Sequence, residues 1–511
     1  MIDRAKGGWW IVFLLSVGSL AAPSGDLRLV DAVKNRDREA VRSLLKERVD
    51  VNAPEADGAT ALAWAAHWDD LETADLLIRA GAKVNAPNDY GATPLWLACN
   101  NGSAAMVERL LRAGANPNAP LLRTGETPLM TCARSGNVDA VKAMLARGAD
   151  PNAKESWRGQ TALMWAVAEK HSEVARALIG KGADIHARSK SGFTAMLQAA
   201  QQGDLESVRI LLAAGADVNE STPEDGSVLV VASASGQEAL SIFLLDQGAN
   251  PNAADVRGIT ALHYAVARGI SYIEHEDYTA WRLPPPNMPE LAKALLAHGA
   301  NPNARIAKDF PQHTRSIKPG PISLAGATPF FLASAYVDLN LMRLLLAAGA
   351  DPKLPAGDTP PLLAAAGLAR RAVDATEEES RSALEAVKLL VELGANVNAP
   401  NRRGMTAMHV AASLGEDAIV QFLADKGAKL DGKTRSGETP WSFAEGMCPI
   451  VNQCGDYVIH KNTADLLLKL GAHTMTFQDF PPVPSSYTSE VDNTGTGKAP
   501  ESIKPSSVRT Q

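Results

Sequence analysis

Apolar and polar residues follow a unit that returns about every 33 residues along this 511-residue chain. Each unit opens with Gly-x-Thr, then Pro or Ala and Leu, and continues into a short alanine-rich run. A second segment with paired leucines follows and ends in Gly-Ala and an Asp/Asn-x-Asn turn. The opening glycines are Gly58, Gly91, Gly125, Gly159, Gly192, Gly258, Gly326, Gly357, Gly404 and Gly437, with one more unit opening near Gly226. This period indicates an array in which each unit buries its apolar face against its neighbours.

Each unit predicts two helices. Thr before Pro, as at Thr93 and Pro94, is typical of a helix start, because Thr caps the free N–H groups and Pro is tolerated in the first turn. The paired leucines, such as Leu110 and Leu111, form the apolar stripe of the second helix. A glycine such as Gly215 then ends that helix in a left-handed conformation.

This unit resembles the ankyrin repeat, whose signature is Thr-Pro-Leu-His-x-Ala. His263 in Thr260-Ala261-Leu262-His263 and His409 in Thr406-Ala407-Met408-His409 match its histidine, and the resemblance implies a structural role for both. The expected fold is all-α: a solenoid over residues 26–476 of about twelve helix-turn-helix repeats joined by β-hairpin-like loops. We expect the tryptophans Trp64, Trp96 and Trp165 to pack along the first helices.

Several segments depart from the pattern. Residues 26–57 lack the Thr-Pro-Leu start and are interpreted as an N-terminal capping repeat. Insertions are expected near 270–289, 305–325, 368–381 and 446–461, and the start at Thr376 predicts a lengthened second helix in the third of these cases. Residues 477–511, rich in Pro, Ser, Thr and Gly, predict a disordered tail.

The first 22 residues are typical of a secretory signal peptide. Arg4 and Lys6 precede an apolar run that starts at Trp9, and the small residues Ala21 and Ala22 provide a cleavage site. We therefore expect an exported protein, periplasmic or secreted, with no stable membrane span after cleavage. The alternative is a membrane anchor that is not cleaved.

The net charge bears on the kind of partner, and the cysteines bear on which disulfides can form. A net charge of -7 argues against a nucleic-acid partner. Cys448 and Cys454 flank a short irregular stretch, and an oxidising compartment favours a disulfide between them. Cys99 and Cys132 occupy positions that usually hold alanine, and we interpret them as small buried residues without a disulfide, because packed helices lie about 8–10 Å apart.

We expect the partner to be another protein, which the chain binds as a monomer. The resemblance implies that hairpin tips and the exposed edge of the first helices carry binding residues, while the core positions repeat almost unchanged. Aromatic and arginine side chains of the kind found in interface hot spots concentrate at these positions in the N-terminal half. The candidate residues are His67, Trp68, Tyr90, Asn100, Asn101, Arg123, Arg134, Trp157, Arg158, Phe193, Gln201 and Gln202, followed further on by Arg257, Arg268, Tyr336, Arg402 and Arg403. The alternative is that these are scattered surface residues without a partner.

No catalytic or cofactor-binding motif is present in the sequence, and we expect neither an enzyme nor a cofactor. The stretch from Ile273 to Tyr278 holds the one dense cluster of acid–base groups, including His275, and is interpreted as a solvated loop because consecutive residues cannot all converge on a metal. Two further functions stay open: an accessory subunit of an exported enzyme system, and a hydrolytic or metal site within the 270–325 insertions.

Overall fold

The computed structural model describes residues 26–267, 288–308, 324–368, 376–447 and 459–481. It divides the chain into two compact units, residues 1–217 and 218–511, called unit 1 and unit 2 below. The signal-peptide prediction, the segment Ile273–Tyr278 with His275, Arg268, Cys448 and Cys454 all lie outside the described residues.

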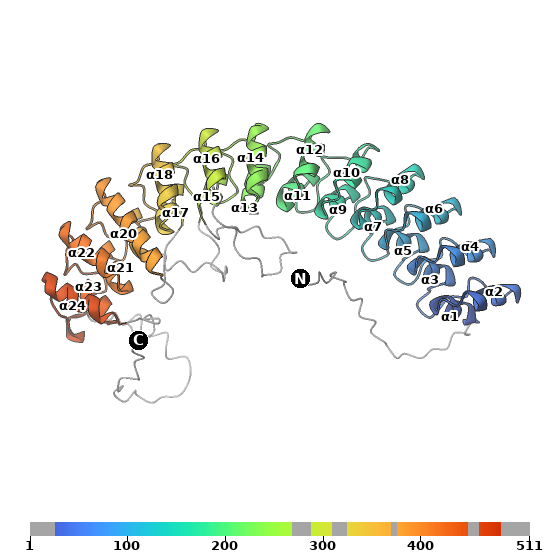
Figure 1. The fold of residues 1–511 in the computed structure, drawn as a ribbon, viewed down its shortest axis with the longest axis horizontal. Coiled ribbons are helices and arrows are strands. Elements are labelled where there is room, and N and C mark those ends of the chain that lie inside the picture. The colour runs from blue at the N-terminus through green and yellow to red at the C-terminus, as the bar shows by residue number, and fades with distance from the viewer. Residues whose placement is uncertain (1–25, 268–287, 309–323, 369–375, 448–458, 482–511) are drawn as a thin grey trace, which may run out of the picture. The chain divides into compact units, whose positions relative to one another are not determined.

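Both units are built from antiparallel helix pairs, with six pairs among the described residues of each (Figure 1). In unit 1 the helices are α1 Arg28–Lys34, α2 Arg38–Lys46, α3 Ala61–His67, α4 Leu71–Arg79, α5 Pro94–Asn100, α6 Ala104–Arg112, α7 Pro128–Ser135, α8 Val138–Ala146, α9 Ala162–Ala168, α10 Ser172–Ile179, α11 Ala195–Gln202 and α12 Leu205–Ala213. Odd-numbered helices are the inner helices of unit 1 and even-numbered ones the outer helices. Inner helices pack on inner helices, and outer helices on outer ones.

Unit 2 repeats this arrangement with interruptions. Its elements are β1 Ser221–Thr222, β2 Gly226–Ser227, α13 Val228–Ala234, α14 Glu238–Asp246, α15 Ala261–Val266, α16 Pro289–Ala297, α17 Pro329–Ala335, α18 Leu339–Ala347, α19 Pro361–Leu363, the π-helical turn η1 Ala364–Leu368, α20 Glu377–Glu392, α21 Ala407–Leu414, α22 Asp417–Asp425, α23 Pro440–Ala444, α24 Lys461–Leu470 and the 3-10 turn η2 Phe477–Asp479. The strands β1 and β2 form one antiparallel hairpin. The expected all-α solenoid of about twelve repeats is confirmed.

Threonines start the inner helices as the sequence predicts. The Thr93 side chain accepts a hydrogen bond from Trp96 N, and Thr161 accepts one from Met164 N. The lengthened helix is also confirmed, because α20 has 16 residues and begins in a capping box between Thr376 and Glu379. These local bonds satisfy backbone donors that a helix leaves free in its first turn.

Small side chains let the inner helices approach closely. Ala65 and Ala66 of α3, Ala98 of α5 and Ala133 of α7 are fully buried, while leucines such as Leu77 fill the outer helices. The hairpin between repeats also comes close to its neighbour: Gly91 has φ 84°, and a Cβ there would come within 2.8 Å of Leu122 N. The repeat therefore selects Ala and Gly for close approach, and Leu for apolar burial.

The Asn of each Asp/Asn-x-Asn turn joins one repeat to the next. Asn118 Nδ2 donates to Gly148 O at 2.8 Å, and its Oδ1 accepts from Asp150 N at 2.8 Å. The same pair of bonds recurs at Asn52, Asn85, Asn152, Asn219, Asn252, Asn303 and Asn398. His186 and Lys353 stand at the corresponding position of two other repeats. We call this series the asparagine ladder.

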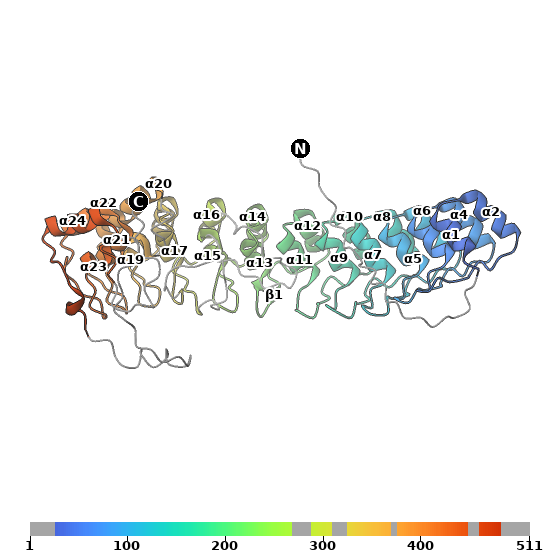
Figure 2. The ribbon, with the colours of Figure 1, turned by 90° about the horizontal axis from the view of Figure 1, so that it is seen from below.

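Backbone bonds also connect the hairpins. Tyr90 O accepts from Leu122 N at 3.0 Å, Thr124 O from Ser156 N at 2.7 Å, and Arg158 O from Lys190 N at 2.7 Å. The hairpin loops project to one side of the helices in each unit (Figure 2). Side chains on successive hairpins are therefore held on a continuous hydrogen-bonded support.

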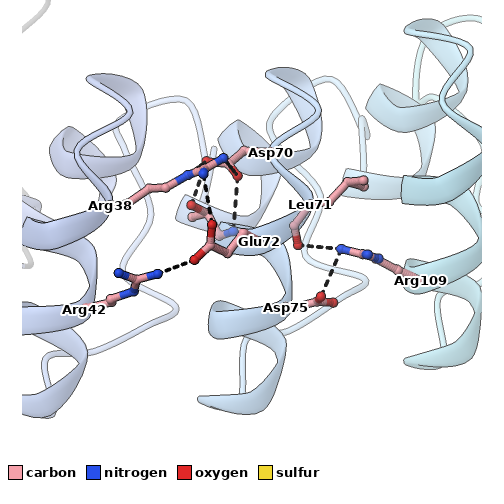
Figure 3. A network of polar contacts seen from close by, with 8 residues as sticks. Arg38, Arg42, Asp70, Leu71, Glu72, Asp75 and Arg109 are labelled. Carbon is pink, nitrogen blue, oxygen red and sulfur yellow. Dashed lines mark hydrogen bonds and ion pairs between the residues drawn. The ribbon is translucent and has the colours of Figure 1, made fainter.

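Charged side chains connect the outer helices of unit 1 (Figure 3). Arg38 of α2 lies 2.7 Å from Asp70 and 2.9 Å from Glu72, and Arg42 also pairs with Glu72. Burial alone would raise the pKa of Asp70, but hydrogen bonds from Arg38 and Thr73 lower it overall. Arg109 of α6 donates to Leu71 O at 2.8 Å and pairs with Asp75 at 2.9 Å. These three arginines of the outer helices are thus paired with carboxylates of the same chain.

The interpretation of Cys99 and Cys132 as separate residues is wrong. They form a disulfide between α5 and α7, and their Cα atoms lie 4.4 Å apart. The separation of about 8–10 Å applies to helix axes, whereas these two residues lie on the facing sides of their helices. Buried alanines beside them, Ala98 and Ala133, remove the bulk that would hold the backbones apart.

The predicted start of the disordered tail, residue 477, lies too early in the chain. Residues 477–481 are described, and Phe477–Asp479 forms a 3-10 turn in which the Asp479 side chain accepts from Thr476 N at 2.6 Å. Phe480 and Pro481 pack against Gly437 of the last hairpin. Composition alone missed this contact, because it depends on a hairpin some 40 residues earlier in the chain. Residues 482–511 lie outside the described part.

Candidate protein-binding surface

The candidate residues in unit 1 fall into three groups by exposure. His67, Trp68, Tyr90, Asn100, Asn101, Arg123, Arg134 and Trp157 are exposed, Arg158 and Gln202 are half-buried, and Phe193 and Gln201 are buried. Of the later candidates, Arg402 and Arg403 are exposed, and Arg257 and Tyr336 are half-buried. The exposed aromatics keep large apolar areas in water: Trp68 is 39% exposed, Tyr90 56% and Trp157 65%.

Phe193 and Gln201 were expected at the surface, and this expectation is wrong. Phe193 directly follows an opening glycine, and it is only 4% exposed. Ala59 and Ala92 at the same position of their repeats are also buried, because the chain turns inward there before the inner helix starts. Gln201, in the last turn of α11, is 5% exposed.

Trp68 belongs to an aromatic cluster at the C-terminal end of α3. Its ring stacks near Trp64 with centroids 6.2 Å apart, and the His67 ring lies 4.7 Å from it. Arg36, from the preceding repeat, lies 4.6 Å above the Trp68 ring. Burial, and then the charge of Arg36, lowers the pKa of His67, so the cluster favours a neutral imidazole beside a fixed cation.

Hydrogen bonds hold the rest of this cluster in place. Trp64 Nε1 donates to Glu55 at 2.5 Å, and Lys34 pairs with the same carboxylate at 2.7 Å while lying 4.8 Å from the Trp64 ring. Asn101 Nδ2 donates to Ala66 O at 3.0 Å and to His67 O at 2.6 Å. Asn101 therefore caps the end of α3, a positioning role that sequence reasoning had not assigned to it.

The hairpin residues form a second group. Tyr90, Arg123, Trp157 and Arg158 lie on successive hairpins joined by the backbone bonds described above. Arg158 lies 4.3 Å from the Trp157 ring. Leu122, which is 73% exposed, belongs to this group, and sequence reasoning missed it. Leu122 lies three residues before the opening glycine Gly125, whereas the hairpin candidates ahead of each opening glycine were taken from the two residues directly before it.

Arg134 belongs to the inner-helix edge between these groups. It lies 5.0 Å from the Trp165 ring of the next repeat and 3.7 Å from Glu126. His171 of that next repeat bonds through Nε2 to Arg134 O at 3.0 Å. The Arg134 side chain is thus directed along the inner helices rather than away from them.

The two consensus histidines are structural, as the resemblance implies. Thr260 N donates to His263 Nδ1 at 3.1 Å, and His263 Nε2 lies 3.1 Å from Ala304 O. In the same way Thr406 N donates to His409 Nδ1, and His409 Nε2 lies 2.9 Å from Gly432 O. Burial lowers the pKa of each histidine to about 4, so both rings are neutral. Each ring connects the start of its helix to the next hairpin through hydrogen bonds.

The described residues show no group of three or more potential metal ligands. Within this same part of the chain, no helix is both long and apolar enough to cross a membrane.

Comparison with known proteins identifies the repeat. The family model for ankyrin repeats (3 copies) matches residues 29–121, 114–189, 196–306, 330–434 and 373–476. The chain belongs to the ankyrin-repeat family. Ankyrin repeats are generally protein–protein interaction modules. Among solved structures, the ankyrin repeat domain of human ASB11 is similar, with 25% sequence identity and a TM-score of 0.40. The match covers 44% of this chain and 98% of that one.

Proposed function

We propose that this ankyrin-repeat protein is an interaction scaffold that holds a protein partner on the exposed aromatic surface of unit 1 and performs no chemistry of its own. The observation that carries this proposal is the exposure of Trp68, Tyr90 and Trp157 on hydrogen-bonded, closely packed repeats. Tryptophan, tyrosine and arginine are the side chains that contribute most binding energy in protein interfaces.

Rigidity supports the same proposal. Backbone bonds between hairpins order the segments that carry Tyr90 and Trp157, and the bonds from Asn101 order the end of α3 beside Trp68. Cations lie over two of the rings, Arg36 over Trp68 and Arg158 over Trp157. A partner therefore meets preformed side chains, and less conformational entropy is lost on association.

We further propose that the scaffold works in an extracytoplasmic compartment. The N-terminal pattern of Arg4, Lys6 and the apolar run after them supports export. The Cys99–Cys132 disulfide is independent support, since such bonds persist mainly in oxidising compartments. N-terminal sequencing of the protein from cell fractions tests this: a mature chain that starts near residue 22 or 23 is expected, and an intact Met1 in the cytoplasm would contradict it.

The surface assignment is tested by affinity capture with wild-type protein and a variant carrying Trp68→Ala, Tyr90→Ala and Trp157→Ala. We expect the variant to lose the captured partner, with binding at least about a hundredfold weaker, because each lost hot-spot aromatic costs about 2 kcal/mol or more. A matched control replaces two exposed residues with Ala: Lys142 of the outer helix α8 and Arg147, which directly follows that helix. If the folded triple variant captures the same partner as wild type, the surface assignment is wrong.

A further inference from the structure

The loops that join inner to outer helices in unit 1 each contain one residue in the left-handed region of backbone conformation. In three repeats this residue is a glycine: Gly102, Gly136 or Gly203. In the other three it carries a charged side chain: Arg36 with φ 56°, Asp69 with φ 54° and Lys170 with φ 61°. Only glycine adopts this conformation without a steric cost. The chain therefore keeps these three charges in spite of an unfavourable backbone conformation.

Arg36 lies over the exposed tryptophan of the next repeat. Its Cζ atom is 4.6 Å from the centre of the Trp68 ring. Across the described residues, no carboxylate lies within ion-pairing distance of the Arg36 side chain. A guanidinium over an aromatic ring keeps its charge, and its N–H groups can still donate to a carboxylate.

Asp69 directly follows Trp68 and occupies the same loop position one repeat after Arg36. Its backbone N–H donates to Ala66 O at 3.2 Å, which fixes the loop, and its side chain is exposed. Its carboxylate has no cationic partner in the part of the chain that the structure describes. We call Arg36, Trp68 and Asp69 together the Trp68 site.

The residues that follow in the same two loops behave differently. Arg38 and Asp70 pair with each other at 2.7 Å, and Arg38 also lies 2.9 Å from Glu72 (Figure 3). Arg36 and Asp69 form no such pair, because the Arg36 guanidinium lies on the Trp68 ring instead. Two opposite charges thus remain available beside a tryptophan that is 39% exposed.

The Trp68 ring is held in place before any partner arrives. Trp64 stacks with its ring centroid 6.2 Å away, and the His67 ring lies 4.7 Å away. The bonds from Asn101 to the last carbonyls of α3 fix the backbone next to the ring. An anchor that is already ordered loses less conformational entropy when it binds.

We propose that the Trp68 site binds a short extended segment of the partner protein that carries an acidic, an apolar and a basic residue at alternate positions. The acidic side chain contacts Arg36, the apolar one covers Trp68, and the basic one contacts Asp69. This inference rests on the proposed function and names the chemistry of the partner.

The spacing of the Trp68 site agrees with such a segment. Arg36 and Asp69 stand one repeat apart, and packed helices lie about 8–10 Å apart. Every second residue of an extended chain faces the same side, and four residues span about 13 Å. Flexible acidic and basic side chains cover the difference. A nucleic acid fits less well, because the Asp69 carboxylate would repel its phosphates.

Three short peptides test the proposal on the full chain. All are capped at both ends, carry the same uncharged fluorescent dye, and differ only in a central Glu-Ser-Leu-Ser-Lys, Glu-Ser-Leu-Ser-Glu or Lys-Ser-Leu-Ser-Lys. We expect the mixed peptide to bind at least about fivefold more tightly than the diacidic or the dibasic one. This preference should shrink as salt is raised from about 50 to about 300 mM.

Charge reversal at one position should switch the preferred peptide. Arg36→Asp leaves two acids beside Trp68 and is expected to prefer the dibasic peptide, whereas Asp69→Arg leaves two cations and is expected to prefer the diacidic one. The matched control is Lys170→Asp, which makes the same charge change as Arg36→Asp at the same loop position three repeats from Asp69. It should keep the preference for the mixed peptide, because the distance of about 30 Å exceeds the screening length.

A glycine variant separates binding from stability. Asp69→Gly relieves the left-handed backbone conformation, so its midpoint of unfolding in urea is expected to equal or exceed that of wild type. The same change should weaken the mixed peptide several-fold, and Trp68→Ala should do so as well. A loss of affinity without a loss of stability is not expected of a residue that serves the fold alone.

Three results would overturn the proposal: no preference for the mixed peptide, an equal switch in the Lys170→Asp control, or unchanged affinity in Asp69→Gly. If any of these occurs while partner capture still depends on Trp68, Tyr90 and Trp157, the proposed scaffold function stands and the mixed-charge segment falls. If capture also does not depend on those aromatics, both proposals fail.

Discussion

Units 1 and 2 share one repeat but use its variable positions differently. In unit 1 the helix pairs follow one another with short hairpins, a disulfide joins α5 to α7, and the exposed positions carry aromatic and basic side chains. In unit 2 long segments separate α15 from α16 and α16 from α17, and two buried histidines connect helix starts to hairpins. This contrast shows that the alanine and leucine core is sufficient for stacking, while the remaining positions can serve binding or form local hydrogen bonds.

A single position of the inner helix shows this freedom. The third residue after the capping threonine is His263 or His409 in two repeats of unit 2, and Ala63, Trp96 or Met130 in repeats of unit 1. The histidine replaces apolar packing with bonds that depend on a neutral ring. Unit 2 thereby acquires a sensitivity to protons that the corresponding positions of unit 1 lack.

The largest expected difference between the units is their response to acid. The pKa of His263 and His409 is about 4 in the folded chain, against 6.5 for an ordinary histidine. The unfolded chain therefore takes up protons first, so the stabilisation is complete above pH 6.5 and is lost as the pH falls toward 4. At pH 5 the loss is about 2 kcal/mol for each histidine, at about 1.4 kcal/mol per pKa unit.

Hydrogen exchange at pH 7 and pH 5, corrected for the intrinsic rate, measures this response. Helices α15, α17 and α21 of unit 2 are expected to lose protection, while α5, α7 and α9 of unit 1 keep most of theirs. The pKa of His67 is also lowered by burial, but its side chain is exposed enough for solvent to screen the effect. Equal loss of protection in both units would contradict the assignment.

Reduction of the Cys99–Cys132 disulfide is expected to destabilise unit 1, the unit that acid affects less. Cys99 and Cys132 are 33 residues apart, and closing a loop of this size stabilises a fold by about 3–4 kcal/mol in the chain-entropy model. Urea unfolding with and without a reductant, followed separately in the two units by hydrogen exchange, should show a lower midpoint for unit 1. The double variant Cys99→Ala with Cys132→Ala is the control, and any response of that variant to reductant must come from elsewhere.

The smallest effect concerns the asparagine ladder, the feature that both units share. His186 stands at a position where other repeats carry an asparagine of the ladder. Its side chain has no amide to bridge a carbonyl and a backbone N–H. His186→Asn should raise the stability of unit 1 by about 1 kcal/mol, the net contribution of a typical hydrogen bond. The converse change, Asn152→Ala, should lower it by a similar amount. If the urea midpoint does not change in either variant, the side-chain bonds of the asparagine ladder do not contribute to stability.

Much of the fold could be predicted because its determinants are local. The threonine caps, the lengthened α20 and the bonds between histidine and threonine at the helix starts all involve residues only a few positions apart. The binding surface was harder to predict. Trp68, Tyr90 and Trp157 are exposed as expected, whereas Phe193 is buried and Leu122, which was not a candidate, is exposed. The conformation of each hairpin decides which of two neighbouring residues faces water.

The repeat, its period and the helices of each unit follow from the amino-acid sequence, because capping, turn formation and apolar periodicity act within one repeat. Only the packing of repeats on one another decided which cysteines meet and where the tail begins to pack. These outcomes depend on atoms of neighbouring repeats, some 33 residues away, whose approach is set by the stacking of small side chains.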